Sequence, residues 1–416
     1  MIAPDLAKNI STAVDKNFDS QVKFLGRLVK TPSVNPFTPE NDSLDQPVEL
    51  PVANLIFNRL KALGFAPKKV GASSKRPNVV CSVGPRRYRK SLILNGHMDT
   101  VQPSGNSKVN PFAGTVRKNR LYGVGALDMK GSLSAYVYAL KAISDLGINL
   151  DGKLTLAFVV DEESGACSQW GTRYLINKGV KAKAAIVGEP GDHTVAIGHR
   201  GGYRFKLTTY GQGIHTGLSL WEKKKMGRNA IVDMMTVVRT LQKMEIPFKP
   251  AKVFPGRKPV FTFPTRIEGG RSINEVPDRC EAYGDVRLMP GNSSSQVKIW
   301  IRDRLSRYPD IKYEVTDLLF VPAVEIDAKE DVVVSLATNA QEVIGDKPQV
   351  RGVGPWNCAW MYITRDIPAV GGFGPAGDNT HQTDEWVSLE SLKQVTEVYA
   401  RTIIDYLGIR EAGKTT

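Results

Sequence analysis

Apolar residues recur every three or four positions in several long stretches of the chain, and this spacing predicts amphipathic helices. Shorter apolar or alternating runs between these stretches predict strands. The predicted helices cover residues 5–30, 52–63, 131–146, 171–178, 229–243, 295–308, 332–344 and 388–407. The predicted strands cover residues 78–83, 92–94, 154–160, 184–187, 203–210, 259–267, 280–288 and 312–318.

The order of these elements divides the chain into two architectures. Before residue 195, strands alternate with helices, which favours an α/β domain with a mainly parallel sheet flanked by helices. From 195 to 318 the order becomes strand, helix, two strands, helix, strand, which is typical of a split βαβ (ferredoxin-like) α+β domain. We therefore expect one domain formed by residues 1–194 and 319–416, with residues 195–318 inserted into it.

The length of 416 residues exceeds what one ordinary core holds, so two domains agree with the size of the chain. A hydrophobic content of 41% and a charged content of 24% are typical of a soluble globular protein. No apolar run approaches membrane-spanning length, and the N-terminal segment lacks the layout of a signal peptide. We expect a cytoplasmic protein with no membrane partner.

The four cysteines are too far apart for a zinc-finger or redox motif, which predicts free buried thiols. They are Cys81, Cys167, Cys280 and Cys358. The net charge of +14 is spread along the chain, and no nucleic-acid-binding signature accompanies it. We expect solvated basic surfaces and no nucleic-acid partner. Steering of acidic small substrates by this charge remains open.

The segment 91–132 carries the first chemical signal. It contains an apolar strand that runs into His97 and Asp99, and Asp128 follows in a loop just before a helix. Asp99 can hold one ring nitrogen of His97, which leaves the other nitrogen for a metal ion. A polar strand end with a hydrogen-bonded histidine explains the same residues, so this segment alone leaves both interpretations open.

Further acids and a histidine lie in later loops. The candidates together are His97, Asp99, Asp128, Glu162, Glu163, Glu189 and His381. Two histidines and three carboxylates, one of them shared, suit a pair of zinc-like ions that activate a water and polarise a carbonyl. In the acidic triplet 161–163, one acid can bind metal while its neighbour accepts a proton, although a solvated turn is the alternative.

These segments resemble the co-catalytic di-zinc amidohydrolases and peptidases. This family includes acetylornithine deacetylase, succinyl-diaminopimelate desuccinylase, aminoacylase and glutamate carboxypeptidase. The matching segments are GHMDTV at 96–101, PFAG at 111–114, LYGVGALDMKG at 121–131, DEESG at 161–165, GEP at 188–190, GIHTG at 213–217, NEVPD at 274–278 and the stretch 374–381. They occur in the family's order and extend over roughly residues 90–390. The resemblance therefore implies a catalytic domain with an inserted lid and dimerisation domain.

The resemblance also implies a metal-binding role for five residues. His97 and Glu189 would bind one zinc ion. Glu163 and His381 would bind the second, and Asp128 would bridge the two. The implied cofactor is two Zn²⁺ per subunit, with Co²⁺ or Mn²⁺ as possible substitutes.

Two acids beside these ligands take other roles in the family. Glu162 corresponds to the general acid/base, and Asp99 to the residue that orients His97. The family also implies a cis peptide bond between Asp128 and Met129. A non-catalytic relative would lack one of the five metal ligands or the base, and this chain has all five ligands and Glu162.

In the inserted domain, His215 matches the histidine that stabilises the oxyanion across the interface of dimeric relatives. A turn histidine after a strand is its alternative reading. Asn274 and Arg287 match positions that contact the substrate's carboxylate or backbone, while a surface arginine on a strand explains Arg287 nearly as well. This match implies a homodimer formed through the inserted domain, while some relatives work as monomers.

The segment 354–360, GPWNCAW, departs from the family pattern. Asn357 stands where an acid is common, and no arginine follows closely. Because no metal ligand lies there, we expect the metals to be unaffected and substrate choice to change. Trp356 and Trp360 would favour a bulky or apolar group.

The resulting prediction is a metal-dependent hydrolase that cleaves the amide bond of N-acyl-L-amino acids. Two zinc ions would activate the water, and Glu162 would take its proton. A dipeptidase or carboxypeptidase of the same family is the alternative, because the same chemistry serves a short peptide. The expected partner is therefore a small N-acyl amino acid or a short peptide.

Overall fold

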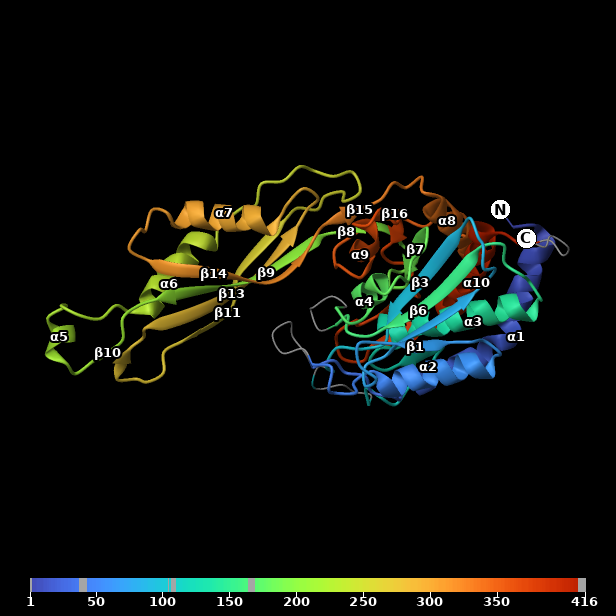
Figure 1. Cartoon of the computed structure of the whole chain (residues 1–416), viewed down its shortest axis with the longest axis horizontal. Helices are drawn as coiled ribbons and strands as arrows, with labels where there is room; N and C mark the ends of the chain where they lie inside the picture. The colour runs from blue at the N-terminus through green and yellow to red at the C-terminus, as the bar shows by residue number, and fades with distance from the viewer. Residues whose placement is uncertain (1, 37–42, 104, 106–109, 164–168, 411–416) are drawn as a thin grey trace. The chain divides into compact units, whose positions relative to one another are not determined.

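The computed structural model describes residues 2–36, 43–103, 105, 110–163 and 169–410 (Figure 1). The chain forms two compact units. The first consists of Met1–His199, Glu325–Val353 and Asn357–Thr416, and the second of Arg200–Val324 and Gly354–Trp356. Both units mix helices with sheets, so the fold is of the α/β kind.

A six-stranded sheet forms the centre of the first unit. Its strands, in spatial order, are β1 (Lys68–Val70), β2 (Asn78–Val83), β6 (Lys153–Val159), β3 (Ser91–His97), β7 (Ala184–Val187) and β17 (Ala369–Val370). The four strands from β6 to β17 run parallel, and β1 and β2 add an antiparallel edge. Strand β3 is buried at every position, which fits its apolar sequence and its central place between two parallel neighbours.

The helices of the first unit pack on this sheet or on one another (Figure 1). They are α1 (Pro4–Val29), α2 (Leu50–Ala62), α3 (Gly131–Asp145), α4 (Thr172–Asn177), α8 (Asp331–Ile344), α9 (Ala359–Ile363) and α10 (Leu389–Leu407). Helix α3 is buried along almost its whole length, because it contacts α1 and α10 as well as the sheet. A kinked turn, η1 (Ala126–Lys130), in which Asp128 and Met129 have non-helical backbone angles, leads directly into α3.

The first unit also contains very short strands that hydrophobic periodicity did not predict. They are β4 (Thr115–Arg117), β5 (Arg120–Tyr122), β8 (Val195–His199), β15 (Val324–Glu325), β16 (Val350–Val353), β18 (Gly377–Asp378) and β19 (Trp386–Ser388), with β15 at the boundary of the unit. Strands β18, β19, β5 and β4 form one small sheet, which joins the segment before η1 to the segment after His381. Most of these strands have two to four residues, too few to show a period.

The second unit contains a four-stranded antiparallel sheet. Its strands, in spatial order, are β11 (Val260–Gly269), β13 (Arg279–Leu288), β9 (Gly201–Tyr210) and β14 (Lys312–Val321). Helices α6 (Ala230–Leu241) and α7 (Ser294–Leu305) share its apolar core, and the chain adds α5 (Ser219–Glu222), β10 (Ile214–His215) and β12 (Glu275–Val276). Side chains of β13 alternate between this buried core and a polar face, as a half-exposed strand requires.

A buried ion pair joins two distant parts of the first unit. Arg76 donates to both carboxylate oxygens of Glu49, at 2.9 and 2.7 Å. The side chains of Arg76, Glu49 and the nearby Asp161 are fully buried. Glu49 Oε1 also accepts the main-chain N–H of Asp161 at 3.1 Å. Since Asp161 immediately precedes Glu162 and Glu163, this network fixes the start of the acidic segment.

The described cysteines Cys81, Cys280 and Cys358 are free and buried, as predicted. Cys167 lies outside the described residues, and so do Ser164 and Gly165, which follow the acidic segment in the sequence. Over the part of the chain that the structure describes, no helix is long and apolar enough to cross a membrane.

Replacement of Arg76 by methionine should lower the free energy of unfolding by about 3–5 kcal/mol, because it leaves Glu49 buried without its partner. Urea unfolding followed by tryptophan fluorescence measures this change. Lys75→Met is the matched control, since that neighbouring side chain is 52% exposed and its substitution should change stability little. Equal stability of the two variants would contradict the role given to the buried pair.

Candidate metal centre

Three parallel strands bring their carboxyl ends to one edge of the central sheet. His97 is the last residue of β3, Glu162 and Glu163 follow β6, and Glu189 follows β7. Because β6, β3 and β7 are neighbours in register, the polar residues after their apolar runs meet at this edge. His97 is 2% exposed, so the sheet and its helices fix the ring firmly.

Asp128 reaches the same place from η1. The peptide bond between Asp128 and Met129 is cis, as the resemblance implied. Glu385, which is 2% exposed, accepts the main-chain N–H groups of Leu127 and Asp128 at 2.8 and 3.0 Å. Lys130 donates on the other side of the turn to two main-chain oxygens in the segment 28–31. The turn that carries the Asp128 carboxylate is therefore held by hydrogen bonds of its main-chain N–H groups and of the Lys130 side chain.

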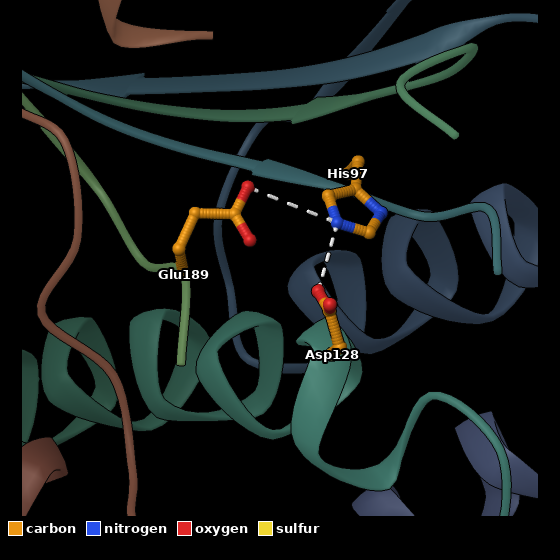
Figure 2. Close-up of side chains that lie close together, drawn as sticks. All are labelled: His97, Asp128 and Glu189. Atoms are coloured by element: carbon orange, nitrogen blue, oxygen red, sulfur yellow. Dashed lines mark hydrogen bonds and ion pairs between the residues drawn. The ribbon is translucent and has the colours of Figure 1, made fainter. Parts of the chain in front are cut away.

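The two oxygens of Asp128 face two different histidines. Oδ1 lies 3.1 Å from His97 Nε2, and Oδ2 lies 3.2 Å from His381 Nε2. Figure 2 shows Asp128 and Glu189 pointing at the ring of His97 from different elements, with Glu189 Oε1 3.9 Å from Nε2. Glu163 Oε1 lies 3.0 Å from His381 Nε2. The five predicted ligands thus lie together, with Asp128 between two pairs.

Three overlapping groups of these residues place their ligand atoms within 4.8 Å of one another. They are His97, Asp128 and Glu189; Asp128, Glu163 and His381; and His97, Glu162 and Glu163. Two ligands of one zinc ion, each about 2.0–2.2 Å from it, lie roughly 3–3.5 Å apart, which matches most of the separations found here. Imidazole nitrogens and carboxylate oxygens suit a divalent ion of this kind. The donor set therefore fits a metal centre, and its two ends fit one ion each.

Burial of several carboxylates in one place shifts their protonation. Burial raises the pKa of Glu162 to about 8 and also raises the pKa values of Glu163 and Glu189, with neighbouring carboxylates adding to the effect. Hydrogen bonds to Asp128 and Glu163 raise the pKa of His381 to about 11, because the imidazolium is the positive charge within reach. If all of these carboxyl groups were ionised, their negative charge would exceed the positive charge of the two histidines, so bound cations would stabilise the ionised forms.

Asp99 contacts His97 through its main chain. Its carbonyl oxygen lies 2.9 Å from His97 Nδ1, whereas its carboxylate is 3.6 Å away. The carboxylate instead accepts the main-chain N–H groups of Glu162 and Glu163, at 3.2 and 2.9 Å, and the side-chain amide of Asn35 at 2.9 Å. Asp99 therefore holds two elements of the site: the ring of His97 and the acidic segment.

Sequence reasoning missed the residues that support these groups. No spacing typical of metal ligands marks Glu385, Asn35 or the pair Arg76–Glu49 in the sequence. Glu385 lies 257 positions from Asp128. One signal was available in Glu385. It is an acid beside the apolar residues of β19, and a charged side chain is seldom fully buried without partners.

In the second unit, His215, predicted to stabilise the oxyanion, lies beside Asn274, predicted to bind the substrate. His215 in β10 and Asn274 beside β12 come within 3.2 Å through Nε2 and Nδ2, and His215 Nδ1 accepts the main-chain N–H of Gly217 at 3.0 Å. Arg287 lies elsewhere in this unit. It donates to Asp285 at 2.7 Å and places its guanidinium 4.3 Å from the ring centre of Trp356.

Comparisons with known proteins agree with this site. A curated relative, N-formyl-4-amino-5-aminomethyl-2-methylpyrimidine deformylase from Bacillus subtilis, is 28% identical over 85% of this chain and 89% of its own. The solved structure of the M20 family metallo-carboxypeptidase Sso-CP2 from Sulfolobus solfataricus has a TM-score of 0.73 at 20% identity, covering 93% of this chain and 99% of that one. The Bacillus subtilis protein YXEP, a dinuclear metal-binding peptidase, has a TM-score of 0.67 at 16% identity, covering 94% and 99%.

The likeness to both solved structures shows a shared fold. The sequence itself matches the family described as Peptidase family M20/M25/M40 over residues 93–405, a span that contains every predicted metal ligand. The chain therefore belongs to the M20/M25/M40 peptidase family and is a metal-dependent hydrolase of that family.

Proposed function

We propose that this hydrolase binds two zinc ions and cleaves the amide bond of N-acyl-L-amino acids. The observation that carries the proposal is Asp128, whose two oxygens each lie about 3 Å from a different histidine while Glu162 stands in the same cluster. His97 and Glu189 would hold one ion, Glu163 and His381 the other, and Co²⁺ or Mn²⁺ could substitute. When bound, two such ions lower the pKa of a shared water and polarise the scissile carbonyl.

Glu162 is the residue proposed to move the proton. Its main-chain N–H is bonded to Asp99, so the segment that carries its side chain is held in place. Burial brings the pKa of Glu162 to about 8, close to neutrality, where a carboxyl group both accepts and releases a proton readily. In this role its carboxylate takes a proton from the attacking water and delivers it to the nitrogen of the leaving amine.

We further propose that His215 and Asn274 contact the substrate and stabilise the oxyanion of the tetrahedral intermediate. Their side chains meet at 3.2 Å, so a substrate that binds one would also approach the other. Both are exposed and would be available to a ligand. The resemblance places such a histidine across a subunit interface, which is the reason to propose a homodimer.

Exposed apolar side chains of the second unit support that homodimer. On α6, Val232 and Met235 are 56% and 47% exposed, and on the edge strand β11, Ile267 is 49% exposed. An unpaired edge strand beside apolar surface is a common place for a second copy to bind. Interface formation by β11 and α6 would cover these side chains.

The comparisons support an amide as the substrate and leave two classes of amide. The B. subtilis deformylase removes a formyl group from an amine, which favours a deacylase. Sso-CP2 is a metallo-carboxypeptidase, which favours the alternative that this enzyme cleaves dipeptides or the C-terminal residue of short peptides. Both reactions attack a carbonyl beside a leaving amine, so the metal centre serves either.

A pooled-substrate assay tests the proposal. The protein is loaded with zinc or cobalt and offered N-formyl, N-acetyl, N-succinyl and N-aromatic-acyl amino acids together with a set of dipeptides, and products are read by mass spectrometry. Cleavage of the acyl amino acids alone supports the deacylase. Cleavage of dipeptides alone moves the enzyme to the peptidases and overturns the deacylase proposal.

Glu162→Gln should keep both metal ions and lose about 10²–10⁴-fold in kcat, because glutamine has the shape of the base but cannot accept the proton. Metal content by mass spectrometry and steady-state kinetics on the best pooled substrate measure the two effects. Glu245→Gln, at an exposed glutamate in a loop, is the matched control and should keep the parent rate. A Glu162→Gln enzyme with the parent rate would refute the assignment of the base.

His381→Ala should reduce the zinc content from about two ions to about one per chain, since it removes the imidazole from one end of the cluster. His193→Ala is the control, because this histidine bonds to Ser391 Oγ at 2.6 Å and is no proposed ligand. Metal analysis after gel filtration in zinc-free buffer gives the count. Two retained ions in His381→Ala would remove His381 from the ligand set.

A further inference from the structure

The two histidines of the candidate metal centre are held by different kinds of backbone. His97 ends the buried strand β3, and its side chain is 2% exposed. His381 lies in the loop 379–385, which joins β18 to β19, and its side chain is 48% exposed. A strand fixes its last residue through the sheet, whereas a surface loop depends on its own local bonds. The position of the His381 imidazole therefore depends on what holds this loop.

Three residues of the loop have a left-handed backbone. Asn379, His381 and Asp384 have φ values of 63°, 59° and 57°. This region is unfavourable for most residues other than glycine, and asparagine and aspartate tolerate it best because their short polar side chains form local hydrogen bonds. Two of the three residues are thus of the types that suit the conformation. Strain of this kind persists only where the surrounding contacts hold it in place.

Asn379 supplies such contacts. Its side-chain Nδ2 donates across the loop to the main-chain oxygen of Asp384 at 3.3 Å. Its main-chain oxygen accepts the N–H of Gln382 at 2.9 Å, and its own N–H donates to Asp378 Oδ1 at 2.8 Å. Asn379 is half-buried, whereas His381 is exposed. The bonds of this one residue therefore join the start of the loop to its tip and to its far end.

The far end of the loop is bonded to the turn that carries Asp128. Glu385, the last residue of the loop, is 2% exposed and accepts the main-chain N–H of Asp128 at 3.0 Å. The tip of the same loop places His381 Nε2 3.2 Å from Asp128 Oδ2. A change in the shape of the loop would move the imidazole relative to this carboxylate, so the bond from Asn379 across the loop bears on the distance between two proposed ligands.

We propose that Asn379 is a positioning residue for the metal ion at the Glu163–His381 end of the cluster. Its left-handed backbone and its bond across the loop hold His381 Nε2 3.0 Å from Glu163 Oε1. The other end of the cluster is built on strands β3 and β7, so it should not depend on Asn379. This inference rests on the proposed metal-binding role of His381.

Asn379→Ala should weaken the binding of one of the two zinc ions about tenfold, because alanine disfavours the left-handed backbone and cannot donate to Asp384. Asn379→Gly should recover part of this affinity, since glycine accepts the backbone conformation but lacks the amide. Titration of the full chain with zinc against a competing chelator measures both affinities. A glycine variant that binds zinc as weakly as the alanine variant would overturn the role given to the backbone.

Asn119→Ala is the matched control. Asn119 also has a left-handed backbone, with a φ of 58°, and it lies in the exposed hairpin between β4 and β5 of the same small sheet. Its substitution should lower the unfolding temperature of the zinc-free protein about as much as Asn379→Ala does, while both zinc affinities stay at the parent's values. If Asn379→Ala weakened both ions equally, its effect would be general destabilisation and the proposal would fail.

A double variant shows whether Asn379 acts through His381. His381→Ala should retain one zinc ion, and adding Asn379→Ala should leave the affinity for that ion unchanged, because the imidazole that Asn379 holds is already absent. A further loss of affinity in the double variant would overturn the proposal. The parent protein tests the two-metal centre separately. A parent that binds only one ion would refute that centre, whereas two ions bound with equal affinities by the parent and by Asn379→Ala would refute only the role of Asn379.

Discussion

Electrostatic repulsion among buried carboxylates is the constraint on which this active centre depends. Glu162, Glu163 and Glu189 meet Asp128 in a region that excludes most water, and burial raises the pKa of each glutamate. The histidines supply part of the missing positive charge, and divalent ions would supply the rest. Hydrogen bonds also hold the segments that carry three of these acids, because Asp99 accepts the main-chain N–H groups of Glu162 and Glu163 and Glu385 accepts that of Asp128.

The sequence predicted the long elements because they depend on local hydrophobic patterns, and the five residues proposed as ligands lie close together in the structure. The predicted strand 92–94 lies in β3, and the predicted helix 131–146 agrees with α3 within one residue. Supporting contacts, such as those of Glu385 with Asp128 or of Arg76 with Asp161, join residues far apart in the chain. No pattern of residue spacing in the sequence predicts such contacts. The short strands of the first unit likewise form by pairing with distant partners, so their own few residues carry no period.

The segment 354–360 shows how a departure from a family pattern acquires a physical meaning. Asn357 belongs to the first unit, where its amide nitrogen donates to the main-chain oxygen of Gly371 and its amide oxygen accepts from Ala359 at 3.0 Å. An ionised aspartate could accept the second bond but could not donate the first. The asparagine is thus required by local bonding, whereas Trp356, three residues before Ala359, belongs to the second unit.

The residues proposed for chemistry and those proposed for substrate recognition lie in different units of one chain. The groups that fit metal ions and the proposed proton carrier all lie in the first unit, and they contact one another directly. The polar groups proposed to contact the substrate, His215 with Asn274, lie in the second. Bond cleavage needs only a carbonyl and a leaving amine, so the metal centre can stay the same while substrates change. We therefore propose that side chains of the second unit decide which amide this enzyme cleaves.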